Sequence, residues 1–397
     1  MLSSFRIKNP SIYIIFLSLI GATPPLATDM YLSAIPSIAA DWNVHVSVVN
    51  LSLVLWFASF SSSLLIFGPL SDKFGRRPVL LFGLWLFVVS SFLCGLATNP
   101  HMLILFRIIQ GMGAAAPSAM VMAICRDRYE GAERQKALAY IGVILAVAPM
   151  VAPSIGTMLL GLGSWRLIFF AQGSMVLITS IIAMGYEETS KEFIKGSIVS
   201  LFLRYKSLLF NKEYAVATTV MGLSISPFYG FIAFSPIAYI KVYGLSGQLF
   251  SVLFGLNAVC AMAGSFASAK LSIKLKQSRM LTAGFIGTFV GGLFVLLFNH
   301  LGYEFFAAGM FIFAFFMGFN RPVSSSLVLE QVRTDIGSAS SFMVFYQFMA
   351  GALCMWLVTL PHPDPLRYYG YMIMSISLVV LIIWPFLFMW LRKKGRI

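Results

Sequence analysis

Charged side chains are scarce in this chain of 397 residues: only 11% are Asp, Glu, Lys or Arg, and 59% are hydrophobic. Soluble domains carry about 25% charged residues, so this composition excludes a soluble globular protein and a disordered one. The apolar runs are continuous over about 20 residues, whereas a transmembrane β-barrel alternates apolar and polar positions. The sequence therefore predicts an all-α integral membrane protein.

Residues for catalysis, metal binding and nucleotide binding are also few. The four cysteines lie within or beside apolar runs without the spacing of metal ligands, so we interpret them as small hydrophobic residues. No Gly-Lys-Ser/Thr phosphate loop and no Ser/His/Asp or zinc pattern is present. We therefore expect no enzyme activity, no cofactor, no metal and no use of ATP. The net charge of +14 requires no nucleic-acid partner, because membrane topology and anionic lipid explain it.

Hydropathy predicts twelve transmembrane helices, which places both termini on one side of the membrane. Most Lys and Arg residues lie in the termini and in every second connection, and only Arg166, Lys241 and Arg367 lie in the others. The positive-inside rule then places both termini in the cytoplasm. The twelve predicted spans are 11–38, 47–70, 79–97, 102–125, 135–162, 165–186, 213–241, 247–273, 279–298, 303–330, 335–360 and 366–391.

The longest break between spans divides the chain into two halves. We predict an N-terminal six-helix bundle over 1–186, a cytoplasmic linker with an interfacial helix over 187–212, and a C-terminal six-helix bundle over 213–397. The halves resemble each other at an offset of about 200 residues, which predicts two parallel repeats around a central cavity. The matching positions are Tyr31 and Phe231, Pro36 and Pro236, Gly83 and Gly284, Pro117 and Pro322, and the basic segments Lys73–Arg77 and Lys274–Arg279.

A compact motif, Gly68-Pro-Leu-Ser-Asp72-Lys-Phe-Gly75-Arg76-Arg77-Pro, lies between the second and third spans. Glycine permits close backbone approach and tight turns, and the charged residues can cap helices or form ion pairs. The motif can be a topology anchor or a latch that gates the two halves. Its specific residue order favours the latch.

This segment resembles the signature loop of the major facilitator superfamily, and the resemblance covers essentially the whole chain. Residues 107–115 resemble the helix 4 motif of the drug:proton antiporters in that superfamily, and residues 148–156 resemble their helix 5 motif, with Pro149, Pro153 and Gly156. Residues 28–36 resemble the helix 1 signature of the bicyclomycin/chloramphenicol-resistance (Bcr/CflA-type) subfamily. Ser33 stands where that subfamily usually has proline, and Thr157 replaces a glycine of the helix 5 motif.

Asp29 is the only carboxylate in the middle of a predicted span. A charge at that depth costs at least about 2.5–3.5 kcal/mol, so we expect this side chain to face a wet cavity or a partner. Asp29 can carry a proton, or it can be a polar brace beside Pro24 and Pro25. The resemblance implies that Arg107 takes part in proton transfer; the alternative is a structural pair that orients the first and fourth spans.

Arg321 is the third charge within the predicted spans. It can bind an anionic group of a substrate or extend to the cytoplasmic interface. Flexible and polarizable side chains suit a cavity that accepts several apolar ligands. The candidate residues of the substrate cavity are Met30, Ser33, Gln110, Met150, Phe228, Tyr229, Asn320, Arg321, Met343 and Gln347.

These features predict a proton-coupled secondary transporter that exports small amphipathic drug-like compounds by alternating access. We expect it to act as a monomer in the bacterial cytoplasmic (inner) membrane. One alternative is export or import of a dedicated metabolite, such as an amino-acid derivative, a sugar or a siderophore. A receptor or a membrane-embedded enzyme is a third possibility, which the internal repeat and the lack of clustered catalytic residues disfavour.

Overall fold

The computed structural model describes residues 10–190, 205–332 and 336–395, and within these ranges it contains helices and no strand. Twelve of the described helices are long and apolar enough to cross a membrane, which confirms the predicted class. The first helices are α1 (Pro10–Leu32), the short α2 (Ile35–Asp41), α3 (Val46–Phe74), α4 (Arg76–Gly95), α5 (Pro100–Arg128), α6 (Gly131–Gly161) and α7 (Arg166–Met184). They are followed by α9 (Lys212–Pro236), the π-helical η2 (Ile237–Val242), α10 (Gly247–Leu271), α11 (Gln277–Phe298), the 3-10 turn η3 (Asn299–Leu301), α12 (Tyr303–Glu330), α13 (Ile336–Thr359) and α14 (Pro365–Lys393).

The chain divides into two compact units, Met1–Leu201 and Phe202–Ile397. This boundary falls within the segment 187–212 for which we predict a linker. Residues 191–204 of that segment, which hold most of the predicted interfacial helix, lie outside the described residues. Residues 205–210 are helical, with Leu208 buried and Leu209 exposed.

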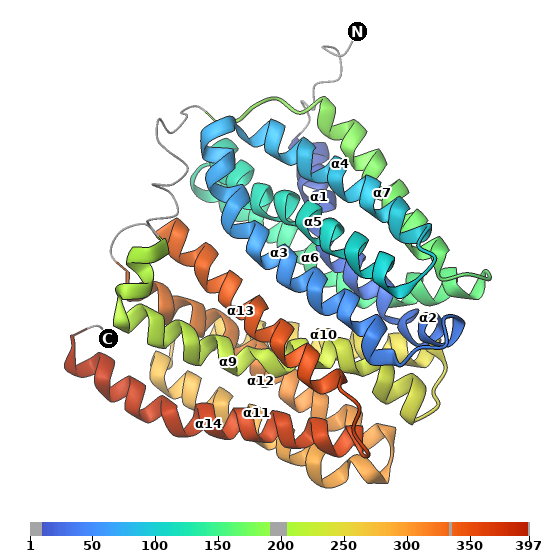
Figure 1. Cartoon of the computed structure of the whole chain (residues 1–397). Helices are drawn as coiled ribbons and strands as arrows, with labels where there is room; N and C mark the ends of the chain where they lie inside the picture. Colours follow the sequence, from blue (N-terminus) through green and yellow to red (C-terminus); the bar gives the residue numbers. More distant parts are fainter. Residues whose placement is uncertain (1–9, 191–204, 333–335, 396–397) are drawn as a thin grey trace. The chain divides into compact units, whose positions relative to one another are not determined.

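The two units use the same helix pairings (Figure 1). In the first unit α3 and α4 pack against α5, α4 packs against α7, and α1 packs against α5, α6 and α7. In the second unit α10 and α11 pack against α12, α11 packs against α14, and α9 packs against α12, α13 and α14. Six pairs of helices in one unit thus have counterparts in the other, as a parallel internal repeat requires.

The first predicted span, 11–38, is not one continuous helix. Helix α1 ends at Leu32, a turn follows, and α2 begins at Ile35 with Pro36 in its first turn. Proline has no amide hydrogen to donate, and its ring restricts the residue before it, so the chain restarts a helix there more readily than it continues one. The predicted span 213–241 likewise ends irregularly, because its α-helix gives way to η2 after Pro236.

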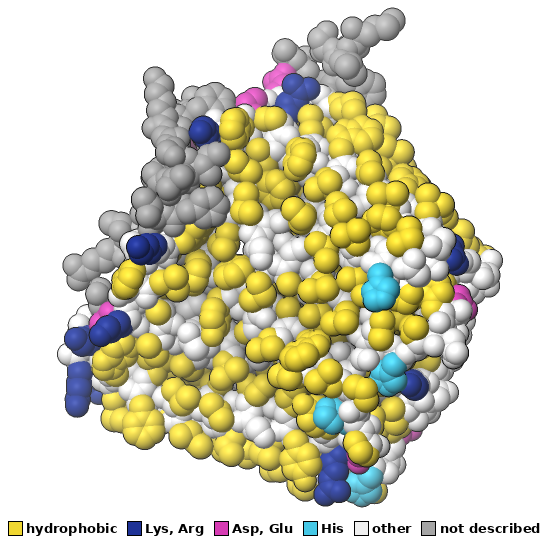
Figure 2. Space-filling model, in the orientation of Figure 1, with side chains coloured by type: hydrophobic (Ala, Val, Ile, Leu, Met, Phe, Trp, Pro, Cys, Tyr) yellow, Lys and Arg dark blue, Asp and Glu magenta, His cyan; other side chains and the backbone are white. Residues whose placement is uncertain are grey.

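Large apolar side chains lie exposed on the outside of the helices. Met122, Met158 and Phe266 are each at least 60% exposed, and Figure 2 shows a face on which hydrophobic side chains predominate while Lys and Arg lie near its margins. In water such a surface is strongly unfavourable, whereas hydrocarbon solvates it. The outer surface therefore fits a lipid bilayer.

Helices α1 and α6 approach each other closely at Gly156. A β-carbon built on this residue lies 2.1 Å from the backbone carbonyl oxygen of Met30. Pro153 lies about one turn earlier in the same helix, and Pro149 lies about two turns earlier. Gly156 of the antiporter-like motif is thus explained by packing, since any side chain here collides with the backbone of α1.

We expect Gly156→Ala to destabilise the protein by about 1–3 kcal/mol, because the added methyl group forces α1 and α6 apart. Thermal unfolding of the purified protein in detergent measures this effect. The matched control is Gly142→Ala in the same helix, where no atom lies within 4 Å of an added β-carbon. Equal melting temperatures for the two variants would contradict the packing role of Gly156.

Candidate functional site

Arg107 of α5 is fully buried in the first unit and holds α1 against α5. Its Nη1 donates to the carbonyl oxygen of Ala27, at 3.1 Å, and to Oε1 of Gln110, at 2.5 Å. The guanidinium also lies over the rings of Tyr31 (4.6 Å), Trp56 (5.5 Å) and Phe169 (5.9 Å). Cation–π contacts with three helices therefore replace a carboxylate partner for this cation.

Gln110 extends this arrangement into a buried hydrogen-bond network. Its Nε2 donates to Oγ of Ser91 at 2.7 Å and to Oε1 of Gln172 at 3.3 Å. Gln172 of α7 in turn donates to the carbonyl oxygen of Ala27. The sequence did not indicate that Ser91 and Gln172 belong to this network, because only the folded bundle brings α4 and α7 to α5. Gln110, predicted to line the substrate cavity, has polar partners on three helices.

Asp29 lies on a different face of α1 from the one that contacts Arg107. It is 5% exposed, and its Oδ1 accepts a hydrogen bond of 2.9 Å from the hydroxyl of Thr28. Residues 27 and 31 share a face of the helix and contact Arg107, and a position two residues from Ala27 is rotated by about 200°. Among the described residues no ion pair joins Asp29 to a basic side chain. No direct hydrogen bond or ion pair among the described residues joins Arg107 to Asp29.

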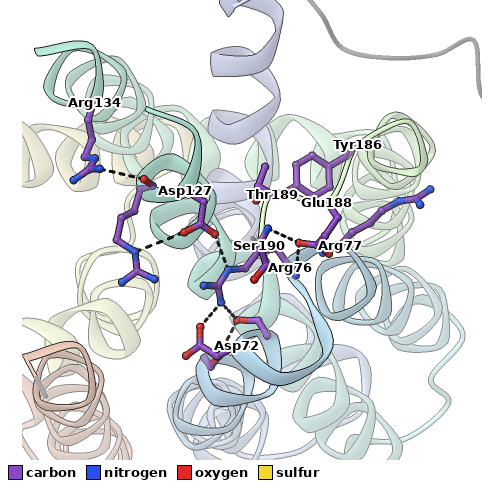
Figure 3. A network of polar contacts seen from close by, with 12 residues as sticks. Asp72, Arg76, Arg77, Asp127, Arg134, Tyr186, Glu188, Thr189 and Ser190 are labelled. Atoms are coloured by element: carbon purple, nitrogen blue, oxygen red, sulfur yellow. Dashed lines mark hydrogen bonds and ion pairs between the residues drawn. The ribbon is translucent and has the colours of Figure 1, made fainter. Parts of the chain in front are cut away.

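The Gly68–Pro78 motif forms a second polar network at the end of the first unit (Figure 3). Arg76 is 5% exposed. Its Nη1 donates to Oγ of Ser71 at 2.6 Å and to Oδ1 of Asp72 at 2.5 Å, and its Nε donates to Oδ2 of Asp127 at 2.9 Å. One guanidinium thus joins the ends of α3, α4 and α5, a task that suits its rigid fork of donors.

Glu188, just beyond α7, caps the beginning of α4 (Figure 3). Its two carboxylate oxygens accept hydrogen bonds of 3.0 Å from the backbone amides of Arg76 and Arg77. A carboxylate at a helix N-terminus satisfies free amides and interacts favourably with the helix dipole. Gly75, directly before this helix, has a φ of +100°, which glycine adopts more readily than other residues.

The two glycines of the motif differ in their surroundings. Gly75 makes the turn, whereas a β-carbon on Gly68 meets no atom within 4 Å. The described polar partners of the motif all belong to the first unit, so a latch between the halves stays a prediction.

Near the motif, the Tyr186 hydroxyl forms a hydrogen bond of 2.6 Å with Thr189. Burial raises the pKa of Tyr186 to about 12, so this phenol stays protonated at neutral pH.

In the second unit, four helices enclose a small polar cavity of about 10 Å³, the space of roughly one water molecule. It brings together Asn320, Arg321 and Gln347, three of the predicted substrate residues. The nine residues that line it are Met221, Ser224 and Ile225 of α9, Thr288 of α11, Met317, Asn320, Arg321 and Ser324 of α12, and Gln347 of α13.

Two of these residues hold buried polar atoms that have no hydrogen-bond partner within the described part of the chain. They are Oδ1 and Nδ2 of Asn320, which is 4% exposed, and Oγ of Ser324, which is 5% exposed. The Asn320 side chain occupies space that is free because residue 284 of α11 is glycine. A β-carbon added to Gly284 would lie 1.9 Å from Oδ1 of Asn320. Buried polar atoms without a partner are unfavourable, and here they lie beside a cavity and a cation, which makes the cavity a candidate functional site.

The other predicted substrate residues do not line this cavity. Phe228 and Tyr229 are neighbours on α9, with ring centroids 6.2 Å apart, and Met343 is buried on α13. Met30, Ser33, Gln110 and Met150 belong to the first unit, where Met30 and Ser33 are buried and Met150 is half-buried. Their part in substrate binding stays a prediction.

The twelve spans, the repeated helix pairings and the buried polar groups define a helical membrane transporter built from two six-helix repeats. The family model of the Major Facilitator Superfamily matches residues 17–355, and the chain belongs to this superfamily. Its twelve spans and its bacterial relatives identify it as a multi-pass protein of the bacterial cytoplasmic membrane.

Several curated relatives align over most of the chain. The uncharacterized MFS-type transporter YdgK of Bacillus subtilis is 30% identical over 349 residues, which cover 86% of this chain and 87% of YdgK. The multidrug resistance protein MdtL of Vibrio parahaemolyticus is 26% identical, covering 84% and 85%. The bicyclomycin resistance protein homolog of Haemophilus influenzae is also 26% identical, covering 88% and 89%.

Solved structures share the fold at low sequence identity. A D-xylose–proton symporter matches with a TM-score of 0.75 at 15% identity, covering 94% of this chain and 96% of the symporter. A bacterial homolog of the lysosomal transporter Spinster, in an inward-facing and occupied conformation, matches with a TM-score of 0.75 at 15% identity, covering 95% and 96%. These likenesses confirm the twelve-helix fold of the superfamily.

We expect Arg76→Lys to destabilise the first unit by about 1.5–3 kcal/mol, because an ammonium group cannot reach Ser71, Asp72 and Asp127 together. The melting temperature of the protein in detergent measures the loss. Arg77→Lys is the control, since Arg77 is exposed and its side chain donates only to the carbonyl oxygen of Met184. A loss no larger for Arg76→Lys than for the control would rule out the proposed junction.

Proposed function

We propose that this protein exports small amphipathic drug-like compounds in exchange for protons, by alternating access. The observation that carries the proposal is the buried carboxyl group of Asp29, which has a hydroxyl partner and no basic partner among the described residues. A carboxylate without a cation is unstable in an apolar environment, and protonation removes its charge. Asp29 can therefore be neutral when buried and ionised when water reaches it.

The names of the relatives support drug export. MdtL is named a multidrug resistance protein, and the Haemophilus relative is named a homolog of a bicyclomycin resistance protein. Both align over more than four fifths of this chain. Together with the antiporter-like motifs at Arg107 and Gly156, these names favour an exporter of several compounds.

Transport of one dedicated metabolite is a second candidate, which the polar cavity around Asn320 and Arg321 supports. A dedicated substrate raises the melting temperature selectively, because a ligand that binds the folded state more tightly stabilises it more at the same concentration. Screening amino-acid derivatives, sugars and siderophores by thermal shift in detergent distinguishes the two candidates. Broad, weak shifts with unrelated drugs favour the exporter.

We further propose that both termini and the Gly68–Pro78 motif face the cytoplasm, and that one chain is the transporting unit. The excess of Lys and Arg at one set of connections supports this orientation. Under this orientation protons enter from outside along their gradient. Each charge moved inward then yields about 2.3 kcal/mol per 100 mV of membrane potential.

We expect Asp29→Asn to abolish pH-driven accumulation of chloramphenicol in proteoliposomes, because asparagine cannot release a proton. Uptake should fall to the level of protein-free liposomes, while binding of the compound in detergent persists. Radiolabelled chloramphenicol measures uptake into proteoliposomes under an imposed pH gradient, and it measures binding to the protein in detergent without a gradient.

The matched control is Asp41→Asn, which removes a carboxylate at the end of α2. Its partner, Nε1 of Trp165 at 2.9 Å, can donate equally to an amide oxygen. This control should transport as the wild type does. Undiminished pH-driven uptake by Asp29→Asn would remove Asp29 from the coupling mechanism.

A further inference from the structure

The cavity in the second unit has the chemistry of a site for a negatively charged head group. We propose that Arg321, Asn320 and Ser324 bind a carboxylate or sulfonate oxygen of an amphipathic compound, so that the protein prefers anionic amphiphiles to cationic ones. This inference rests on the proposed function only in that the bound compound is taken as the transported one. The binding preference itself requires no proton coupling.

The first argument is the balance of charge. Arg321 is the only charged residue among the nine that line the cavity, and no described ion pair includes it. It lies nine residues before the end of α12 at Glu330, which corresponds to about 14 Å along the helix. Its side chain is exposed and has no ion-pair partner among the described residues, so an anion from outside the protein can reach it and compensate its charge.

The second argument is the balance of hydrogen bonds. Ser224 donates to the carbonyl oxygen of Met221 at 2.7 Å, and Thr288 donates to that of Phe285 at 3.0 Å, so both hydroxyl donors are engaged. The unsatisfied groups of Asn320 and Ser324 offer an amide NH2 and a hydroxyl as donors, and only Oδ1 and the same hydroxyl as acceptors. With the guanidinium of Arg321 added, donors predominate.

The third argument is the arrangement of these donors. Asn320 and Ser324 are four residues apart on α12 and therefore lie on one face, with Arg321 beside them. The cavity of about 10 Å³ has the size of a single oxygen atom or water molecule. It therefore fits one oxygen of a head group, while the exposed Arg321 can meet the rest of the charge. Charge-assisted hydrogen bonds of this type are strong and directional.

Binding of matched fluorescent probes to the purified full-length protein in detergent tests the proposal. Dansylglycine carries a carboxylate, its methyl ester is uncharged, and dansylcadaverine carries an ammonium group on the same fluorophore. We expect the dissociation constant of dansylglycine to be about tenfold lower than that of dansylcadaverine, a difference of about 1.4 kcal/mol. Tighter binding of the cation, or no binding of dansylglycine, overturns the proposal.

Variants assign the preference to the cavity. Arg321→Gln should abolish the preference for dansylglycine, Arg321→Lys should keep part of it, and Arg279→Gln, which removes an exposed arginine outside the cavity, should leave it unchanged. A preference that survives Arg321→Gln in a folded protein also overturns the proposal. The wild-type comparison of the probes stands even where a variant fails to fold.

Asn320→Leu separates a ligand-binding role from a structural one. Replacing an unsatisfied amide by an apolar group of similar shape should leave the melting temperature unchanged or raise it. The same change should weaken binding of both dansylglycine and its methyl ester. A lower melting temperature with unchanged binding shows that Asn320 serves the fold and not the ligand.

These binding measurements use no gradient, so they are independent of the transport test. Loss of the charge preference with intact Asp29-dependent exchange refutes the head-group site and leaves the antiporter. A clear preference without proton-driven uptake refutes the antiporter and leaves the site.

Discussion

The structure depends on one constraint: within hydrocarbon no water is present, so each polar group of a spanning helix needs a partner inside the protein. In the first unit the fully buried Arg107 is held by two hydrogen bonds from its Nη1 and by three aromatic rings, while its Nε and Nη2 have no hydrogen-bond partner among the described residues. The polar chain from Arg107 through Gln110 to Gln172 then links α1, α4, α5 and α7. Packing and hydrogen bonding thus stabilise the same four helices.

The two units share their helix pairings but differ in polar content. At the end of the first unit Arg76 joins three helices through Ser71, Asp72 and Asp127. In the second unit the side-chain polar atoms of Asn320 and Ser324 have no hydrogen-bond partner among the residues that the structure describes. The two units thus share their packing but hold different polar side chains, and each has buried polar atoms without a partner among the described residues, such as those of Asn50 in the first unit and Asn257 in the second. Our proposals assign Asp29 to protons because of its buried carboxyl group, and the Arg321 cavity to substrate because unsatisfied donors lie beside a cation there.

The fold alone does not decide what is carried. A D-xylose–proton symporter and a Spinster homolog share it at 15% identity, so the arrangement of helices is compatible with very different cargoes. Specificity lies in the few polar groups that the helices present to a ligand. In our proposal those groups are the donors and the one cation of the second-unit cavity. The relatives at 26–30% identity align over 84–88% of the chain, and identity at that level does not specify single positions.

The amino-acid sequence by itself determined the twelve spans, because burial in lipid is a local property of each apolar run. The predicted span 303–330 coincides with α12, and the turn at Gly75 agrees with the conformational freedom of glycine. Only the tertiary structure decided that α1 breaks after Leu32 and that Arg107 bonds to a carbonyl group of α1 and not to Asp29. It also gathered Asn320, Ser324 and Gln347 from two helices around one cavity. A sequence pattern specifies which residues share a helix face, but the rotation of each helix against partners distant in the chain follows from packing of the whole bundle.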